Sequence, residues 1–178
     1  MATNRTIPIR EPSRPPAGTV GRVTQSPDLE GALIEYLSDA HALEQMGLRV
    51  LEECCRLDPD EMTADIYRAH HQQTRGHLRL IDERLSAHHV SPPAPGEAAV
   101  RVAALRLEFT PDACCTPAEL AISAYTLENL EIGVYHALRG IARRVHDHET
   151  EVIAQQILEQ EEDAAELVAS RIDRALLV

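Results

Sequence analysis

Apolar residues recur every three or four positions along four stretches of this chain, each about thirty residues long. This spacing places the apolar side chains on one face of an α-helix, and it is typical of helices that pack nearly parallel to one another. With a rise of about 1.5 Å per residue, each helix would be about 45 Å long. We therefore predict four helices of matching length, at residues 27–57, 59–88, 117–145 and 148–177.

Three of these stretches begin with a side chain that can cap a helix, followed directly by proline. The three capping residues are Ser26, Asp58 and Thr116. Proline is well tolerated at the first helical position, where its missing N–H has no partner to lose. Glu61 and Glu119 stand three residues after their caps, which predicts capping boxes. Asp147 predicts a weaker fourth helix start.

About thirty residues, 86–116, connect the second predicted helix to the third. Residues 91–96 are rich in proline and are predicted to be non-helical, while residues 97–109 could form a short helix or an extended segment. A hairpin between antiparallel helices needs far fewer residues. The third helix can therefore start from the opposite end of the bundle. We predict an all-α fold, a ferritin-like four-helix bundle at residues 26–178 with a long crossover between helices 2 and 3.

The composition agrees with helices packed on helices. Apolar residues make up 44% of the chain, but there is no Trp and only one Phe, so the core must consist of aliphatic side chains. Such a core suits a helical bundle better than a β-sandwich. Residues 1–25 differ, because they hold four prolines and four arginines against one glutamate and show no apolar periodicity. We predict a flexible basic tail there.

Charge and hydropathy exclude several classes of partner. The formal net charge of −12 argues against nucleic-acid binding, which requires a basic surface. The chain has neither the run of about eighteen apolar residues that spans a bilayer nor the apolar core of a signal peptide. We therefore expect no membrane partner and a cytoplasmic location. No motif for a nucleophile, a phosphate loop or an organic cofactor is present, so the sequence assigns no reaction.

The four cysteines form two adjacent pairs, Cys54-Cys55 and Cys114-Cys115. With a crossover connection, both pairs would lie at the same end of the bundle. They could act as small buried hydrophobic residues, form a redox-sensitive disulfide or bind a metal through thiolates. Zinc is the weakest of these interpretations, because adjacent cysteines lack the two-residue spacing of common zinc sites.

The predicted core faces also carry titratable residues. These are His41 and Glu44 in the first helix, His70 and His77 in the second, Glu128 and Glu131 in the third, and Glu161 in the fourth. An unpaired buried carboxylate costs several kcal/mol, so such groups must be paired, neutralised or bound to a cation. Any one of them could be a hydrogen-bonded core residue or a partly solvated one. Their coincidence on four helices predicts a metal site, with these candidate ligands: Glu44, His77, Glu128, Glu131 and Glu161.

Two segments resemble the YciF-like proteins, stress-associated bacterial members of the ferritin-like superfamily. The first half matches at Leu37-Ser38-Asp39, Glu44, Ala69-His70, Thr74, Gly76 and Ile81-Asp82. The second half matches at Glu128-x-x-Glu131-Ile132-x-x-Tyr135 and at Glu159-x-Glu161. The resemblance covers about 100 residues and implies a ferritin-like bundle, commonly a homodimer, with a metal-binding role. Glu44, Glu128, Glu131 and Glu161 match acids of the family.

The sequence departs from the family at three places. Gln72 and Gln73 stand where the family tends to have two glutamates, and Ala164 takes the place of a histidine in the last helix. His77 follows Gln73 by four residues, not three. An amide oxygen binds divalent iron or manganese less well than a carboxylate. These departures argue against a full dinuclear oxidase site and leave a mononuclear or vestigial site as the alternatives.

Two functions follow from these observations. The first is a metal-binding protein for iron or manganese, acting in stress-related metal or peroxide handling. The second is a non-enzymatic dimeric bundle that acts as a structural or interaction protein in stress.

Overall fold

A computed structural model describes residues 28–104 and 115–176 of the chain. All regular secondary structure in these residues is helical. The helices are α1 (Leu29–Leu57), α2 (Glu61–Ala87), α3 (Pro95–Ala104), α4 (Pro117–Val145) and α5 (His148–Ala175). The predicted tail, residues 1–25, lies outside the described residues. None of the helices described is both long enough and apolar enough to cross a membrane.

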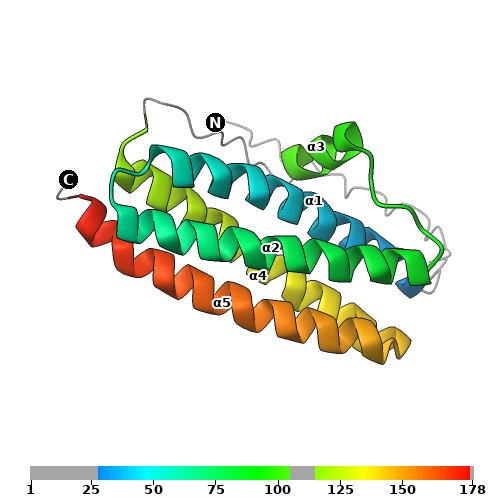
Figure 1. Cartoon of the computed structure of the whole chain (residues 1–178). Helices are drawn as coiled ribbons and strands as arrows, with labels where there is room; N and C mark the ends of the chain where they lie inside the picture. Colours follow the sequence, from blue (N-terminus) through cyan, green and yellow to red (C-terminus); the bar gives the residue numbers. More distant parts are fainter. Residues whose placement is uncertain (1–27, 105–114, 177–178) are drawn as a thin grey trace, which may run out of the picture.

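The four long helices form a bundle in which α1 contacts α2 and α4, and α5 also contacts α2 and α4. Figure 1 shows that α2 and α4 both begin at the end of the bundle where α1 ends, so these two helices run parallel. The short helix α3 lies outside the bundle and packs on α1. The predicted ferritin-like topology, with a long crossover between the second and third bundle helices, is confirmed.

Two of the four predicted helix starts are confirmed in detail. Thr116 and Glu119 form the capping box of α4, and the Asp147 carboxylate accepts a hydrogen bond from the backbone N–H of Thr150. The start of α1 was predicted two residues too early, because Asp28 is the capping residue and accepts from the N–H of Gly31 at 2.9 Å.

The predicted capping box at the start of α2 is wrong. The Asp58 carboxylate accepts from the backbone N–H of Asp60 at 2.9 Å, two residues further on. Asp60 then occupies the N-cap position without a side-chain capping hydrogen bond, and α2 begins at Glu61. Aspartate commonly binds the backbone two residues ahead, and here that contact competes with the cap.

The prediction that residues 91–96 are non-helical is wrong for residues 95 and 96, which belong to a helix. Helix α3 begins at Pro95, where proline loses no hydrogen bond, and Ala98 donates its backbone N–H to the carbonyl of Ala94. The short helix is thus the correct one of the two alternatives for the following residues, up to Ala104. Arg101 links α3 to α1 through a 2.7 Å contact with Asp39.

The cysteine-bearing end of α1 and the start of α4 lie at the same end of the bundle, as predicted (Figure 1). Cys54 is buried between the two helices, and its thiol is 3.9 Å from the carbonyl oxygen of Leu120 in α4. Burial raises the pKa of Cys54 to about 12, so this thiol stays protonated. Cys54 and Cys55 are not in a disulfide. Cys54 therefore acts as a small core residue, and Cys114 lies outside the described residues.

Candidate metal centre

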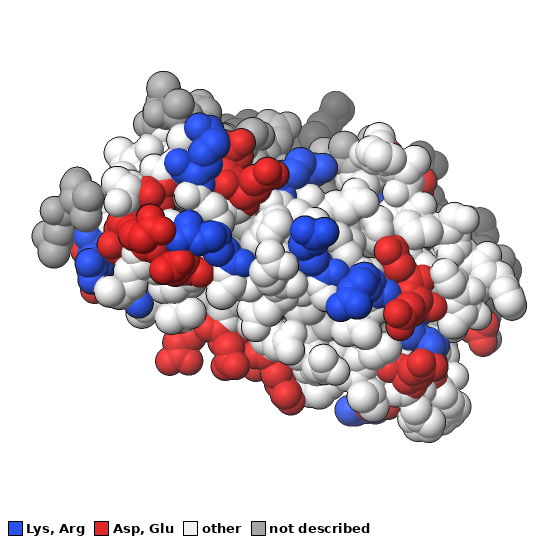
Figure 2. Space-filling model, in the orientation of Figure 1, with Lys and Arg blue, Asp and Glu red and all other residues white. Residues whose placement is uncertain are grey.

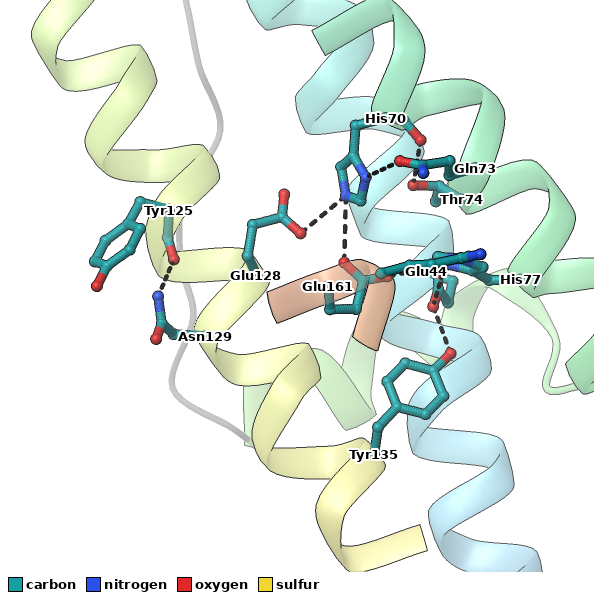
Figure 3. A network of polar contacts seen from close by, with 11 residues as sticks. Glu44, His70, Gln73, Thr74, His77, Tyr125, Glu128, Asn129, Tyr135 and Glu161 are labelled. Carbon is teal, nitrogen blue, oxygen red and sulfur yellow. Dashed lines mark hydrogen bonds and ion pairs between the residues drawn. The ribbon is translucent and has the colours of Figure 1, made fainter. Parts of the chain in front are cut away.

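Six titratable side chains meet in the middle of the bundle, and every bundle helix supplies at least one. They are Glu44 from α1, His70 and His77 from α2, Glu128 and Glu131 from α4, and Glu161 from α5. We call this set the central cluster. Each member exposes at most 4% of its surface. Figure 3 labels the members other than Glu131 and shows Glu161 between the two histidines. The five residues predicted as ligands from the sequence are all brought together here.

The central cluster consists of two overlapping groups. One group holds His70, Glu128, Glu131 and Glu161, and the other holds Glu44, His77 and Glu161. Within each group, one ligand atom from every residue lies within 4.8 Å of the others. Glu161 belongs to both groups, with Oε2 facing His70 and Oε1 facing His77.

His70 is held on both sides of its ring. Its Nε2 atom lies 2.9 Å from Glu128 Oε2 and 3.3 Å from Glu161 Oε2, facing the carboxylates. Its Nδ1 atom faces away and lies 3.2 Å from the side-chain oxygen of Gln73. Because an amide oxygen can only accept, it fixes a proton on Nδ1 of the neutral ring and leaves Nε2 free to act as a ligand.

His77 is held in the same way but with its nitrogens exchanged. Its Nδ1 atom faces the cluster, 2.8 Å from Glu161 Oε1 and 3.3 Å from Glu44 Oε1. Its Nε2 atom lies 2.7 Å from the side-chain oxygen of Gln160 in α5. The two glutamines thus orient both imidazoles from outside the cluster. Neither glutamine was predicted to have this role.

Two further residues shape the cluster. Tyr135 is fully buried and donates its hydroxyl hydrogen to Glu44 Oε1 (Figure 3). Gly47 of α1 faces Glu131, and a Cβ atom at position 47 would lie only 3.2 Å from Glu131 Oε1. The glycine therefore leaves space for the Glu131 carboxylate between α1 and α4.

Several carboxylate oxygens in the cluster have no hydrogen-bond donor among the described residues. These are Glu44 Oε2, Glu128 Oε1 and Glu131 Oε1, all shielded from solvent. Leaving a buried acceptor unpaired costs about 1–3 kcal/mol. The two oxygens of Glu161 face the two histidines, with Oε2 at 3.3 Å from His70 and Oε1 at 2.8 Å from His77. The cluster therefore contains more buried acceptors than the neighbouring donor groups satisfy, and bound protons or a cation would satisfy them.

Burial and mutual repulsion determine the protonation of the carboxyls. Burial raises the pKa of Glu44, and it raises that of Glu131 well above its ordinary value, with repulsion from Glu161 adding to the effect. Burial likewise raises the pKa of Glu128 to about 8, although His70 opposes this. Burial also disfavours ionisation of Glu161, but the contacts with His70 and His77 outweigh it and hold that pKa below its usual range.

The two histidines have raised pKa values. Burial by itself would lower both, but the carboxylates outweigh it and raise the pKa of His70 to about 11 and that of His77 to about 10. Without a cation, the cluster therefore balances its charge with bound protons. A divalent ion competes for the same atoms.

His70 is the member of the central cluster that was not predicted from the sequence to be a metal ligand. The spacing in the sequence could have indicated this role, because His70 and His77 stand two helical turns apart on one face of α2. A second signal was Ala164, where a histidine of α5 was expected and only a methyl group is present. His41 is buried but pairs with Asp82 at 3.2 Å, and it is not a member of either group.

The crossover topology and a central cluster of carboxylates and imidazoles define a ferritin-like four-helix bundle. The chain belongs to the family described as a domain of unknown function, DUF892, whose model matches residues 28–176. No curated protein shows a significant match to the sequence.

Solved structures share this fold at low sequence identity. The stress protein YciF of E. coli is 20% identical, with a TM-score of 0.69 over 83% of this chain and 96% of that one. The bacterioferritin-related dodecameric thioferritin of Bacteroides fragilis is also 20% identical, with a TM-score of 0.69 over 82% and 90%. A ferritin-like diiron-carboxylate protein of Bacillus anthracis is 16% identical, with a TM-score of 0.68 over 83% and 99%.

Proposed function

We propose that this protein binds two divalent transition-metal ions, iron or manganese, in the central cluster. The observation that carries the proposal is the sharing of Glu161 between two groups of buried donors. His70, Glu128 and Glu131 would hold one ion, and Glu44 and His77 the other. Glu161 would bind both. A mixture of carboxylate and imidazole ligands suits iron and manganese.

The residues gathered in the central cluster support binding of two ions more strongly than the sequence pattern did. Dimetal carboxylate bundles use four glutamates and two histidines, with one histidine on each of two helices. The central cluster also contains four glutamates and two histidines. Here α2 supplies both histidines and α4 supplies two glutamates. His70 thus compensates for Ala164, and Glu128 or Glu131 compensates for the missing glutamate of α2.

The residues around the cluster would position the ligands and exclude water. Gln73 and Gln160 keep one nitrogen of each histidine directed inward, and Tyr135 holds one oxygen of Glu44. When bound, a pair of iron ions supplies the electrons needed to reduce peroxide or dioxygen. We therefore assign the protein to stress-related handling of metal or peroxide, supported by its similarity to a stress protein and to a diiron-carboxylate protein.

Metal analysis tests this proposal directly. Protein purified without chelator, or loaded anaerobically with iron(II) or manganese(II), should contain two equivalents by elemental analysis and calorimetry. Glu161→Gln should lose both equivalents, because both groups depend on this carboxylate. Glu159→Gln, at an exposed position of the same helix, is the matched control and should retain both. A well-folded parent protein that binds neither metal would leave the non-enzymatic bundle as the function.

The assembly is a further part of the proposal. The thioferritin neighbour is described as dodecameric, which supports self-association of this fold. We predict a homodimer in solution. Light scattering coupled to gel filtration measures the mass, and a monomer or a larger cage would contradict the prediction.

A further inference from the structure

A pocket of about 400 Å³ lies between α2 and α5, directly outside the central cluster. Its wall includes His70 and Gln73 from α2 and Gln160, Asp163 and Ala164 from α5. The α2–α5 face carrying it is turned toward the viewer in Figures 1 and 2. Gln73 and Asp163 are exposed, whereas His70 is almost fully buried. The pocket therefore connects the surface with one member of the cluster.

His70 separates this pocket from the carboxylates. One side of its ring faces Glu128 and Glu161 at 2.9 and 3.3 Å, and the other side is held by Gln73. Gln160, also in the pocket wall, contacts the outer nitrogen of His77 at 2.7 Å. The pocket is thus linked to both groups of the cluster through one imidazole and two amides.

Small side chains keep the pocket open. Ala69 on α2 and Ala164 on α5 both line it, and neither side chain extends beyond one methyl group. The contact between α2 and α5 is the least extensive among the neighbouring bundle helices. A larger side chain at either position would fill the space that leads to His70.

The surface beside the pocket favours a cation. Exposed acids follow α5 here, at Glu159, Glu162, Asp163 and Glu166, and no arginine occurs in α5 before Arg171. Figure 2 shows acidic side chains along the lower edge of the molecule, over α5. Acidic side chains at the opening of a pocket with a low-dielectric wall raise the local concentration of cations.

Two other pockets lack a connection to the cluster. One lies between α1 and α4 around Met46 and Thr126, and one lies between α1 and α2 around Cys55 and Gln72. Neither is lined by any of the six cluster residues.

We propose that the α2–α5 pocket is the entry site through which a hydrated divalent cation reaches the central cluster. The Asp163 carboxylate and the side-chain oxygens of Gln73 and Gln160 are the outer ligands, since hard cations bind oxygen donors of this kind. His70 lies between the pocket and the carboxylates, and the cation reaches the central cluster by passing this residue. This inference rests on the proposed metal-binding function, which supplies the destination.

Cobalt(II) loading measured by stopped-flow absorbance tests the route, with release measured by an excess of chelator. Ala164→Leu fills the pocket and should slow loading and release by the same factor, on the order of ten-fold, as expected when access limits the rate. The affinity and the two-ion stoichiometry should be unchanged, because no ligand is altered. Ala69→Leu narrows the pocket from α2 at an exposed position and should act in the same direction even if Ala164→Leu folds poorly.

Asp163→Asn should slow loading several-fold at low ionic strength, and added salt should remove the difference. Matched controls are Glu162→Gln, the adjacent exposed acid outside the pocket wall, and Thr126→Leu, which fills the pocket between α1 and α4. Both control variants should load cobalt(II) at a rate closer to that of the parent protein than the pocket variants do. Loading of the Ala164→Leu and Ala69→Leu variants at the parent rate would overturn the entry route while leaving metal binding intact. Absence of cobalt(II) binding by the parent itself would instead remove both proposals.

Discussion

Two polar clusters of the bundle differ in how completely their groups are paired. At one end of the bundle, Arg84 of α2 donates to Thr150 at 2.8 Å and to both oxygens of Asp147 at 3.0 and 3.1 Å. His88 contacts the same aspartate at 2.8 Å, and Glu149 also binds Arg84. We call these five residues the turn cluster, because they join α2 to the α4–α5 turn.

The turn cluster supplies a donor for each of its main acceptors, whereas the central cluster does not. Asp147 receives hydrogen bonds on both oxygens and also caps α5. In the central cluster, Glu44, Glu128 and Glu131 each keep a buried oxygen without a donor. A cluster whose groups are all paired stabilises the fold, whereas unpaired buried acceptors lower stability until a proton or a cation satisfies them.

The largest expected effect separates the two groups within the central cluster. His70→Gln should weaken one of the two metal-binding steps by more than about 100-fold, since a direct ligand matters more than its outer partners. His77→Gln should weaken the other step. Calorimetric titration with manganese(II) would resolve the two steps, and His136→Gln, at a half-exposed histidine of α4, is the control. Equal loss of both steps in either variant would contradict the division into two groups.

The second prediction concerns a substitution that removes the arginine of the turn cluster. Arg84→Met keeps much of the apolar stem but removes the arginine partner of the partly buried Asp147 carboxylate, which should reduce the free energy of unfolding by about 2 kcal/mol. Chemical denaturation measures this loss. Arg143→Met removes an arginine from an exposed pair with Glu151 and should change stability little. A small effect of Arg84→Met would show that the turn cluster does not hold the fold.

Apart from Glu161, whose pKa is lowered, the groups of the central cluster should give stability a pH dependence opposite in sign to that of Asp147 in the turn cluster. Glu44, Glu128 and Glu131 have raised pKa values, so the folded metal-free protein holds protons that the unfolded chain releases above about pH 4. Their contribution to stability therefore falls as pH rises. His70 and His77 act in the same direction, and their stabilisation is lost as pH passes through about 10 to 11.

Asp147 acts in the opposite direction. Burial would raise its pKa, but hydrogen bonds from Thr150, His88 and Arg84 outweigh this and hold the pKa well below its usual range. Its stabilisation is complete above about pH 4 and is lost as the pH falls further. Thermal melts of metal-free protein should thus show stability falling from about pH 5 to 9, and Asp147→Asn should remove part of the acid sensitivity. Stability that rises across the neutral range would contradict the protonation assigned to the central cluster.

The smallest expected effect concerns Glu131. Burial and repulsion from Glu161 raise the pKa of the Glu131 carboxyl well above its ordinary value, so Glu131→Gln should leave the free energy of unfolding of the metal-free protein unchanged or increase it by up to about 1 kcal/mol. The same variant should bind metal more weakly. Melting temperatures with and without manganese(II) measure both effects. A large loss of stability without metal would show that the ionised carboxylate supports the fold.

Much of the fold could be predicted from the sequence because the relevant signals are local. Apolar spacing located the four bundle helices, and the capping residues Thr116 and Asp147 located two of their starts. The errors occurred where two local interactions compete. Asp58 could cap α2 or bind the backbone two residues ahead, and Pro95 could interrupt a helix or begin one. Packing of the surrounding elements decides between such alternatives, and the sequence around each residue does not.

The candidate site was predictable in its members but not in its arrangement. Charged residues on apolar faces identified Glu44, Glu128, Glu131, Glu161 and His77. The structure brings these five together, and their role as ligands stays a prediction. His70 was on the same face of α2, but its spacing alone could not show that its ring reaches Glu128 and Glu161.

The sequence by itself determined the length, the periodicity and the polar exceptions of each helix, because these depend on residues three or four positions apart. The crossover topology followed from the length of the connection at residues 86–116. Only the tertiary structure decided that Glu161 lies between the two histidines, that Gln73 and Gln160 hold their outer nitrogens, and that a pocket opens beside Ala164. These relations depend on the rotation and height of one helix relative to another, since a side chain on one helix meets a partner about 80 residues away in the chain. Packing of the whole bundle sets that rotation and height.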